Sequence, residues 1–395
     1  MMRRRAVLAL TPDLSRSDVN RTLLSLLDEL GRAGAVDPTR TRVVAGEGGG
    51  LAPDMVGAAD LAAVRVVGGG ADRVGAVAAR VHPRARPAGE RVGLSWGLAR
   101  HPSRGGMGPP DVVWAHGAAA LTLAEALPRP ARRAPLVVRL PEGPLGLARA
   151  GGPDVAERLD RARLIVVGTT VLRTHLVSDL GLAPNRIAVH PPWILAAPTD
   201  DDPPPAVPPD ALVVAGGGPI GWPAGTDLFV ALAAELPAEV DGRPVHCVWV
   251  GRTDDAEAAE RIATDIALRD LADRVHVVQT DGWGAGWPAP ALAVVTARES
   301  PLPLLALDAA RRSVPVIGHR TSGLVDVLPE AVHDEALVDL FANGDLAARA
   351  TALLREPQAR FSLGAEQGAH VTRHHDARSR VAGLWADVAS HLARG

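Results

Sequence analysis

Short apolar runs alternate along the chain with longer segments in which apolar residues recur every three or four positions. In the first half, the runs predict β-strands at residues 6–10, 41–45, 111–114, 136–139, 164–167 and 187–190. The longer segments predict helices at 19–32, 118–126, 155–161 and 171–180. Strands that alternate with helices form parallel sheets covered on both faces, so this half predicts a Rossmann-like α/β domain.

The same alternation restarts after residue 210. It predicts strands at 211–215, 245–250, 275–278, 292–296 and 314–317, and helices at 226–236, 255–269, 304–312, 324–328 and 346–355. The tail from residue 365 is also helical, and 381–392 is amphipathic. Because open α/β sheets bind ligands at the carboxyl ends of their strands, two such domains predict a cleft where those ends face each other.

A segment rich in aspartate and proline, residues 198–210, separates the halves. It buries little apolar area and its prolines stiffen it, which is typical of an interdomain linker. We therefore expect two doubly wound domains, at 1–197 and 211–375, joined by this linker. A final helix at 376–395 could cross back to the first domain.

Composition narrows the chemistry. The 395-residue chain has a net charge of −3, and all 42 basic residues are arginine because lysine is absent. This excludes a lysine Schiff base and a P-loop. The single cysteine, Cys247, excludes an intramolecular disulfide and a cysteine-based zinc site, and its apolar neighbours predict an inert thiol. The near-neutral balance argues against a nucleic-acid-binding protein.

The apolar run at 6–10 is too short for a signal peptide, and a first strand explains it better. No stretch approaches the ~18 uninterrupted apolar residues of a membrane span. We expect a soluble, cytoplasmic protein, and a peripheral membrane contact stays open. The lysine-free composition is typical of a GC-rich genome such as that of an actinobacterium.

Residues 296–310 carry the strongest signal for chemistry. A strand is followed by a polar loop, and Pro301 and Pro303 then open a helix. A helix that starts at the carboxyl end of a strand exposes unpaired N–H groups and the positive end of its dipole, which suits an anion. Asp308, farther along the helix, could accept hydrogen bonds from ribose hydroxyls. An α/β crossover with a solvated acid explains the same residues without a ligand.

Several motifs, in chain order, resemble one family. They lie at 111–116, 163–170, 185–189, 221–229, 248–251, 271–275, 298–304 and 322–326. The segment 298–304 resembles the donor-binding motif of family-4 glycosyltransferases with the GT-B architecture of two facing Rossmann-like domains. It is most similar to the subgroup with the motif Arg-Glu-Asp-Pro-Phe-Pro-Leu.

The resemblance implies a retaining, metal-independent transfer of a sugar from a nucleotide-sugar on the second domain, without a cofactor. The unknown acceptor, a polysaccharide, a lipid-linked glycan or a secondary metabolite, would bind the first domain. Catalytic roles are implied for His116, Glu299 and Ser300. The resemblance implies donor contacts for Asp308, Gly218, Trp283, Pro301 and Leu302, and we expect Arg252 and Arg298 to bind the donor as nearby arginines.

The sequence departs from the family pattern at four positions. Ser300 replaces an acid, Ala224 replaces a lysine and Gly218 or its neighbour replaces a basic residue. Val19 stands where the family has a glycine that allows close approach to the donor. Nearby arginines could replace the lost charge, and the candidates are Arg252, Arg298 and Arg139.

Other interpretations stay open. The departures suit a catalytically degenerate GT-B protein that binds a ligand or partner, and a sugar-nucleotide epimerase shares the architecture. Residues 216–221 fit a dinucleotide-binding motif, although prolines delay the next helix. His370 and His374 could share a helix face and bind a metal, but a solvated face explains them too. Trp283 could stack on a base or pack within its loop.

Overall fold

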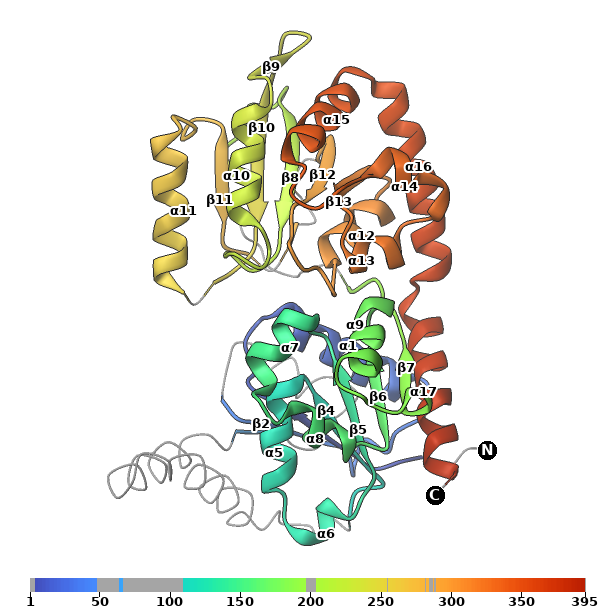
Figure 1. Ribbon diagram of the computed structural model, residues 1–395. Coiled ribbons are helices and arrows are strands. Elements are labelled where there is room, and N and C mark those ends of the chain that lie inside the picture. Colours follow the sequence, from blue (N-terminus) through green and yellow to red (C-terminus); the bar gives the residue numbers. More distant parts are fainter. Residues whose placement is uncertain are drawn as a thin grey trace, which may run out of the picture. The chain divides into compact units, whose positions relative to one another are not determined.

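The computed structural model describes residues 4–47, 64–66, 109–196, 204–253, 255–280, 282–283, 287 and 289–394 (Figure 1). The chain forms two compact units: Met1–His190 together with Arg378–Gly395, and Pro191–Ala377. Each unit contains an open sheet of parallel strands connected by helices, which confirms the predicted α/β fold class.

The first unit has a sheet in the order β3-β2-β1-β4-β5-β6-β7. Its strands are β1 (Val7–Thr11), β2 (Arg42–Ala45), β3 (Val64–Val66), β4 (Val112–His116), β5 (Leu136–Leu140), β6 (Leu164–Val167) and β7 (Ile187–Val189). Its helices are α1 (Asp18–Arg32), η4 (Ala118–Ala120), α5 (Leu121–Ala126), α6 (Arg129–Arg132), α7 (Pro144–Gly151), α8 (Val155–Asp160), α9 (Thr170–Ser178), η5 (Pro184–Arg186) and α17 (Ala377–Ala393). Ser17 and Thr169 cap α1 and α9 with side-chain hydrogen bonds, which explains where these helices begin.

The second unit has a sheet in the order β11-β10-β8-β12-β13-β14, and β9 pairs antiparallel with β10. Its strands are β8 (Leu212–Gly217), β9 (Glu239–Val240), β10 (Arg243–Val250), β11 (Val275–Val278), β12 (Leu292–Val295), β13 (Val316–His319) and β14 (Leu337–Val338). Its helices are α10 (Thr226–Glu235), α11 (Ala256–Leu268), α12 (Leu304–Arg311), α13 (Ser322–Val327), η6 (Glu330–Val332), α14 (His333–Ala336), α15 (Asn343–Arg355) and α16 (Pro357–His374).

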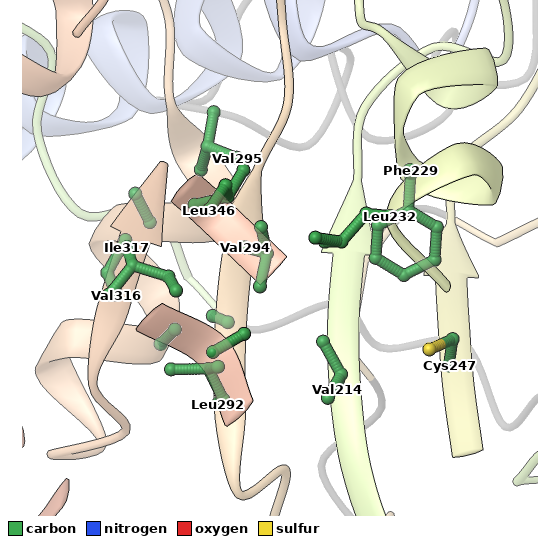
Figure 2. Packing of buried hydrophobic residues seen from close by; sticks show 14 of the residues in the cluster. Val214, Phe229, Leu232, Cys247, Leu292, Val294, Val295, Val316, Ile317 and Leu346 are labelled. Carbon is green, nitrogen blue, oxygen red and sulfur yellow. The ribbon is translucent and has the colours of Figure 1, made fainter. Parts of the chain in front are cut away.

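The core of the second unit lies between this sheet and the helices on it. Figure 2 shows Val214 of β8 and Cys247 of β10 in the same layer as Phe229 of α10. Phe229 meets Trp249 edge to face, with ring centroids 5.2 Å apart. A Cβ on Gly216 would lie 2.6 Å from Phe229, so the glycine is what lets the ring approach the strand.

The chain passes between units earlier than the predicted linker. Trp193 is fully buried, and the Ile194 N–H donates to the His375 carbonyl at 2.9 Å, which ties this segment to the second unit. The predicted linker 198–210 lies partly outside the described residues, and 204–210 falls within the second unit. The helix α17 belongs to the first unit from Arg378 onward.

One predicted strand is misplaced. The prediction was 314–317, whereas β13 is Val316–His319. Ser313 has a φ of 58°, and the Val314 N–H donates to the Ala309 carbonyl at 2.9 Å, so both residues close α12 instead of joining the sheet. Among the described residues, no helix combines the length and the apolar character needed to cross a bilayer.

Candidate functional site

Glycine contacts hold together the loops that follow β8, β10 and β12 at the carboxyl edge of the second unit's sheet. A Cβ on Gly251 would overlap the carbonyl of Gly218, and a Cβ on Gly225 would overlap the carbonyl of Thr296. The Thr296 hydroxyl also donates to the Gly225 carbonyl at 2.8 Å. The three loops are therefore packed backbone against backbone, as at the edge where open α/β sheets bind ligands.

The start of α12 adjoins this cradle of loops. Its first turn holds no acidic residue, and its N-cap, Pro303, makes no side-chain capping bond. Leu305 lies 3.3 Å from the position of a Cβ on Gly217, so this turn is next to the end of β8. A Cβ on Gly323 would overlap the carbonyl of Ser300, which packs the β13 loop on the same segment. The uncapped helix start favours an anion here.

Gly218 and Ala224, the two positions where the resembling family has basic residues, are neighbours in the structure. A Cβ on Gly218 would lie 3.4 Å from the Cβ of Ala224. Gly218 has a φ of 131°, and its carbonyl accepts a hydrogen bond from the Trp249 indole at 3.1 Å. Neither position carries charge, so any positive charge beside them comes from other residues.

Arg298 is held by an acid of the same edge. Its guanidinium makes two bonds of 2.7 Å to the Asp227 carboxylate and one of 2.7 Å to the Trp222 carbonyl. It also lies 4.7 Å from the Trp222 ring centroid. Burial alone would raise the pKa of Asp227, but the bonds and charge of Arg298 outweigh it and lower that pKa. The pair therefore braces the β8–α10 loop.

Arg252 directly follows Gly251, the glycine that packs against the Gly218 carbonyl. Its carbonyl accepts from the Ile220 N–H at 3.1 Å, so its backbone runs beside the β8–α10 loop. Its side chain is exposed. Of the two arginines predicted for this unit, Arg298 is paired with Asp227, and Arg252 follows Gly251, the residue that packs on Gly218.

Asp308 lies on α12 and pairs with arginines of its own helix. Its carboxylate oxygens are 2.8 Å from Arg311 and 3.1 Å from Arg312. Arg312 in turn donates to the Trp283 carbonyl at 3.3 Å. The predicted ribose-binding acid is thus linked through one arginine to the loop that follows β11, and its side chain is 23% exposed.

Trp283 packs inside the protein. It is 4% exposed and meets Trp287 edge to face, with centroids 5.4 Å apart. Both rings join a buried cluster with Val213 and Val248. Of the two interpretations left open for Trp283, the structure therefore shows packing in this conformation.

The remaining predicted donor and catalytic residues of this unit lie directly before α12. Ser300 is 8% exposed, and the Glu299 N–H donates to the Pro223 carbonyl at 3.4 Å. Pro301 and Leu302 are half-buried at the turn into α12. These residues therefore lie at the uncapped start of α12.

The dinucleotide-binding interpretation of residues 216–221 fits less well, because the helix that follows them, α10, begins only at Thr226.

Sequence reasoning missed His319, which ends β13. It is fully buried, and neither ring nitrogen makes a hydrogen bond within the described residues. Burial lowers its pKa, the charge of Arg298 adds to this, and the nearby Thr296 backbone opposes it. A polar residue at the carboxyl end of a predicted parallel strand is the signal that would have found it.

His116 lies in the first unit and is fully buried at the end of β4. Its Nε2 is 2.9 Å from the Val19 carbonyl, which can only accept, and its Nδ1 accepts from the Trp114 indole at 3.5 Å. The ring is therefore neutral with its proton on Nε2. Burial, and then the charge of Arg139, hold its pKa well below the usual value. The predicted catalytic histidine thus connects β4 to the start of α1.

The metal hypothesis gains no support in the part of the chain that the structure describes. His370 and His374 do share a face of α16, with ring centroids 4.6 Å apart. Within the described ranges, however, three or more histidine, cysteine, aspartate or glutamate residues nowhere gather into a metal site.

No known family model matches the chain, and no curated protein matches its sequence. Solved structures do match its fold. HepE from Anabaena in complex with UDP-glucose has a TM-score of 0.73 at 14% identity, covering 97% of this chain and 99% of that one. Sucrose-phosphate synthase from Thermosynechococcus elongatus has a TM-score of 0.66 at 14% identity over 99% and 100% of the chains. A glycosyltransferase from Rickettsia africae has a TM-score of 0.65 at 11% identity over 100% of both. The chain therefore has the GT-B fold of these proteins, with two Rossmann-like domains.

Proposed function

We propose that the chain is a glycosyltransferase that takes its sugar from a nucleotide-sugar. The observation that carries the proposal is the glycine-packed cradle beside the uncapped start of α12. Backbone N–H groups at such a helix start bind phosphate groups. HepE, which shares the fold, was solved with UDP-glucose, and this supports a UDP-hexose as donor.

In the proposed mechanism, the diphosphate lies between the start of α12 and Arg252. As the bond to the sugar breaks, negative charge grows on the diphosphate, and the N–H groups and the guanidinium stabilise it without a metal. Glu299 and Ser300, directly before α12, would orient the sugar. Asp308 would bind the ribose by giving up one of its arginine partners. By its resemblance, the transfer retains the anomeric configuration.

The acceptor is proposed only as a class, a glycan, a lipid-linked glycan or a secondary metabolite, bound by the first unit. There His116 would act by holding the start of α1 in place, since both of its ring nitrogens are bonded. A cytoplasmic location belongs to the same proposal.

A second candidate function is a GT-B protein that binds nucleotide without transferring sugar. It is favoured by one observation: Gly218 and Ala224 lie side by side without charge, while Arg298 is paired with Asp227. Both candidates predict nucleotide binding, and only the first predicts turnover.

The test of the first candidate is a panel of UDP-, GDP-, dTDP- and ADP-sugars, read by release of the nucleoside diphosphate. Slow hydrolysis of one donor family supports a transferase, and binding without hydrolysis supports the second candidate. Release of nucleotide with the sugar epimerised would instead indicate an epimerase. A thermal-shift experiment that shows no response to any of the four nucleoside diphosphates would contradict both candidates.

The role of Arg252 can be tested separately. Arg252→Ala is expected to weaken UDP binding about tenfold and to leave uridine binding unchanged, because a charge-assisted bond to phosphate is lost. The matched control is Arg261→Ala on α11, an exposed arginine paired with Glu257. Equal effects on UDP and uridine in calorimetry would show that Arg252 does not contact the diphosphate.

A further inference from the structure

The first unit contains a cavity at the opposite edge of its sheet from His116. The cavity has a volume of about 500 Å³. It lies at the amino ends of β4 and β5, where Val113 and Leu136 contribute to its wall. Residues of α5, α6, α8, the turn after α8 and η5 also line it. Its volume is within the range of about 300–1,000 Å³ that is usual for small-molecule sites.

The floor of the cavity is apolar. Leu121, Leu127 and Ala162 line it and are buried in the core of the unit. Leu136 and Ala134 are partly buried against the same core. An apolar ligand group placed here would leave water for a surface that is already packed and rigid.

The wall of the cavity is basic. Five arginines and one glutamate line it: Arg132, Arg158, Arg161, Arg163, Arg186 and Glu125. Arg158 bonds to Glu125 at 2.9 Å, Arg161 to Glu157 at 2.7 Å, and Arg186 to Asp160. These arginines are balanced by carboxylates and form the fixed part of the wall.

The other two lining arginines are not balanced by carboxylates. The Arg132 side chain makes no hydrogen bond or ion pair within the described residues, and it is exposed. Arg163 donates through Nε to the His391 carbonyl at 3.0 Å, and the structure, where it describes the chain, gives it no acidic partner. The cavity therefore combines an apolar floor with two positive charges that lack a counter-charge.

We propose that this cavity binds a small phosphate ester with an apolar body. A phosphate carries up to two negative charges and matches the two unbalanced guanidiniums, and the apolar body matches the floor. A soluble ligand suits the site better than a bilayer. The large apolar side chains that the described part of this unit exposes are Leu145 and Val171, and neither lines the cavity.

The test is calorimetry on the full-length protein with 1-naphthyl phosphate, with 1-naphthol and inorganic phosphate as the two half-ligands. We expect a Kd of about 0.1 mM for the ester and binding at least tenfold weaker for each half. Arg132→Gln and Arg163→Gln should each weaken the ester about tenfold. Arg133→Gln, an exposed neighbour outside the lining, is the control and should change binding less than twofold. Unchanged melting temperatures would show that the variants are folded.

Several results would overturn the proposal. They are equal binding of naphthol and the ester, equal effects of Arg133→Gln and Arg132→Gln, and competition by UDP, which would place the ester elsewhere. Co-sedimentation with phosphatidylglycerol vesicles that depends on Arg132, without binding of the ester, would show a membrane contact instead.

Discussion

Cys247 illustrates how position sets the chemistry of one residue. It lies in β10 among apolar side chains of the second unit (Figure 2), and burial raises the pKa of its thiol to about 12, against an opposing charge from Arg274. We expect no reaction with Ellman's reagent at pH 8 in the folded protein and one thiol per chain in urea, because the thiolate is the reactive form. Rapid labelling without denaturant would contradict the burial of this strand.

His116 predicts a pH dependence of stability. Its pKa is lowered in the folded state, so below the unfolded value of about 6.5 the unfolded chain takes up a proton that the folded chain does not. Stability should therefore be unaffected above that pH and fall by roughly 1 kcal/mol per pH unit below it. His116→Gln can keep both hydrogen bonds and should reduce this slope in urea denaturation at pH 7.5, 6.5 and 5.5, while His319, whose pKa is also lowered by burial, keeps part of it. His374→Gln, at an exposed position, is the control and should keep the slope of the original protein.

Individual residues differ in how far the sequence predicts them. The sequence predicts the loop formed by the glycines after β8 and the helix start marked by the prolines before α12, because local backbone geometry requires these residue types there. The pairing of Arg298 with Asp227 was not, because the partners are 71 residues apart and meet only in the folded sheet. The packing of Trp283 could not be told from stacking for the same reason, since sequence does not show which surface covers a ring.

At the scale of elements, the packed loops make Gly251 the sharpest test of the cradle. In Gly251→Ala the new Cβ would overlap the backbone of Gly218, and neither backbone can rotate away as a side chain can. We expect the free energy of unfolding to fall by about 1–3 kcal/mol and UDP binding to be lost. The control is Gly344→Ala in α15, whose Cβ would be 3.7 Å from Glu235, an ordinary contact. Equal melting temperatures for the two variants would mean that the loops are not packed as described.

Some elements were predicted with their observed bounds, and others were missed. The strands β6 and β11 have the predicted bounds, because β6 is a complete apolar run and β11 is interrupted only by His276. The helices α6, α7 and α14 and the strands β3, β9 and β14 were missed. All of them except α7 have two to four residues, too few to show a period. The offset of β13 arises because Val314, an apolar residue that suits a strand, closes α12 instead.

At the scale of the whole molecule, α17 joins the first unit although the second unit precedes it in the chain. The Arg163 side chain donates to the His391 carbonyl at 3.0 Å, and His190 pairs with Asp387 at 2.9 Å. Removing residues 378–395 should therefore destabilise the first unit and leave the second unchanged. Hydrogen exchange should show faster exchange in β6 and β7 and no change in β8 and β12. Equal acceleration in both units would contradict this division.

The chain passes from the first unit to the second and back again, and this has a consequence for folding during synthesis. The second unit is one continuous stretch inserted into the first, so all of its residues leave the ribosome before α17 does. The first unit begins emerging earlier but lacks one of its helices until α17 is made. Domains often complete their folding in the order in which they emerge. Here the order of completion is reversed, and the half-finished first unit is the state that a nascent-chain chaperone would meet.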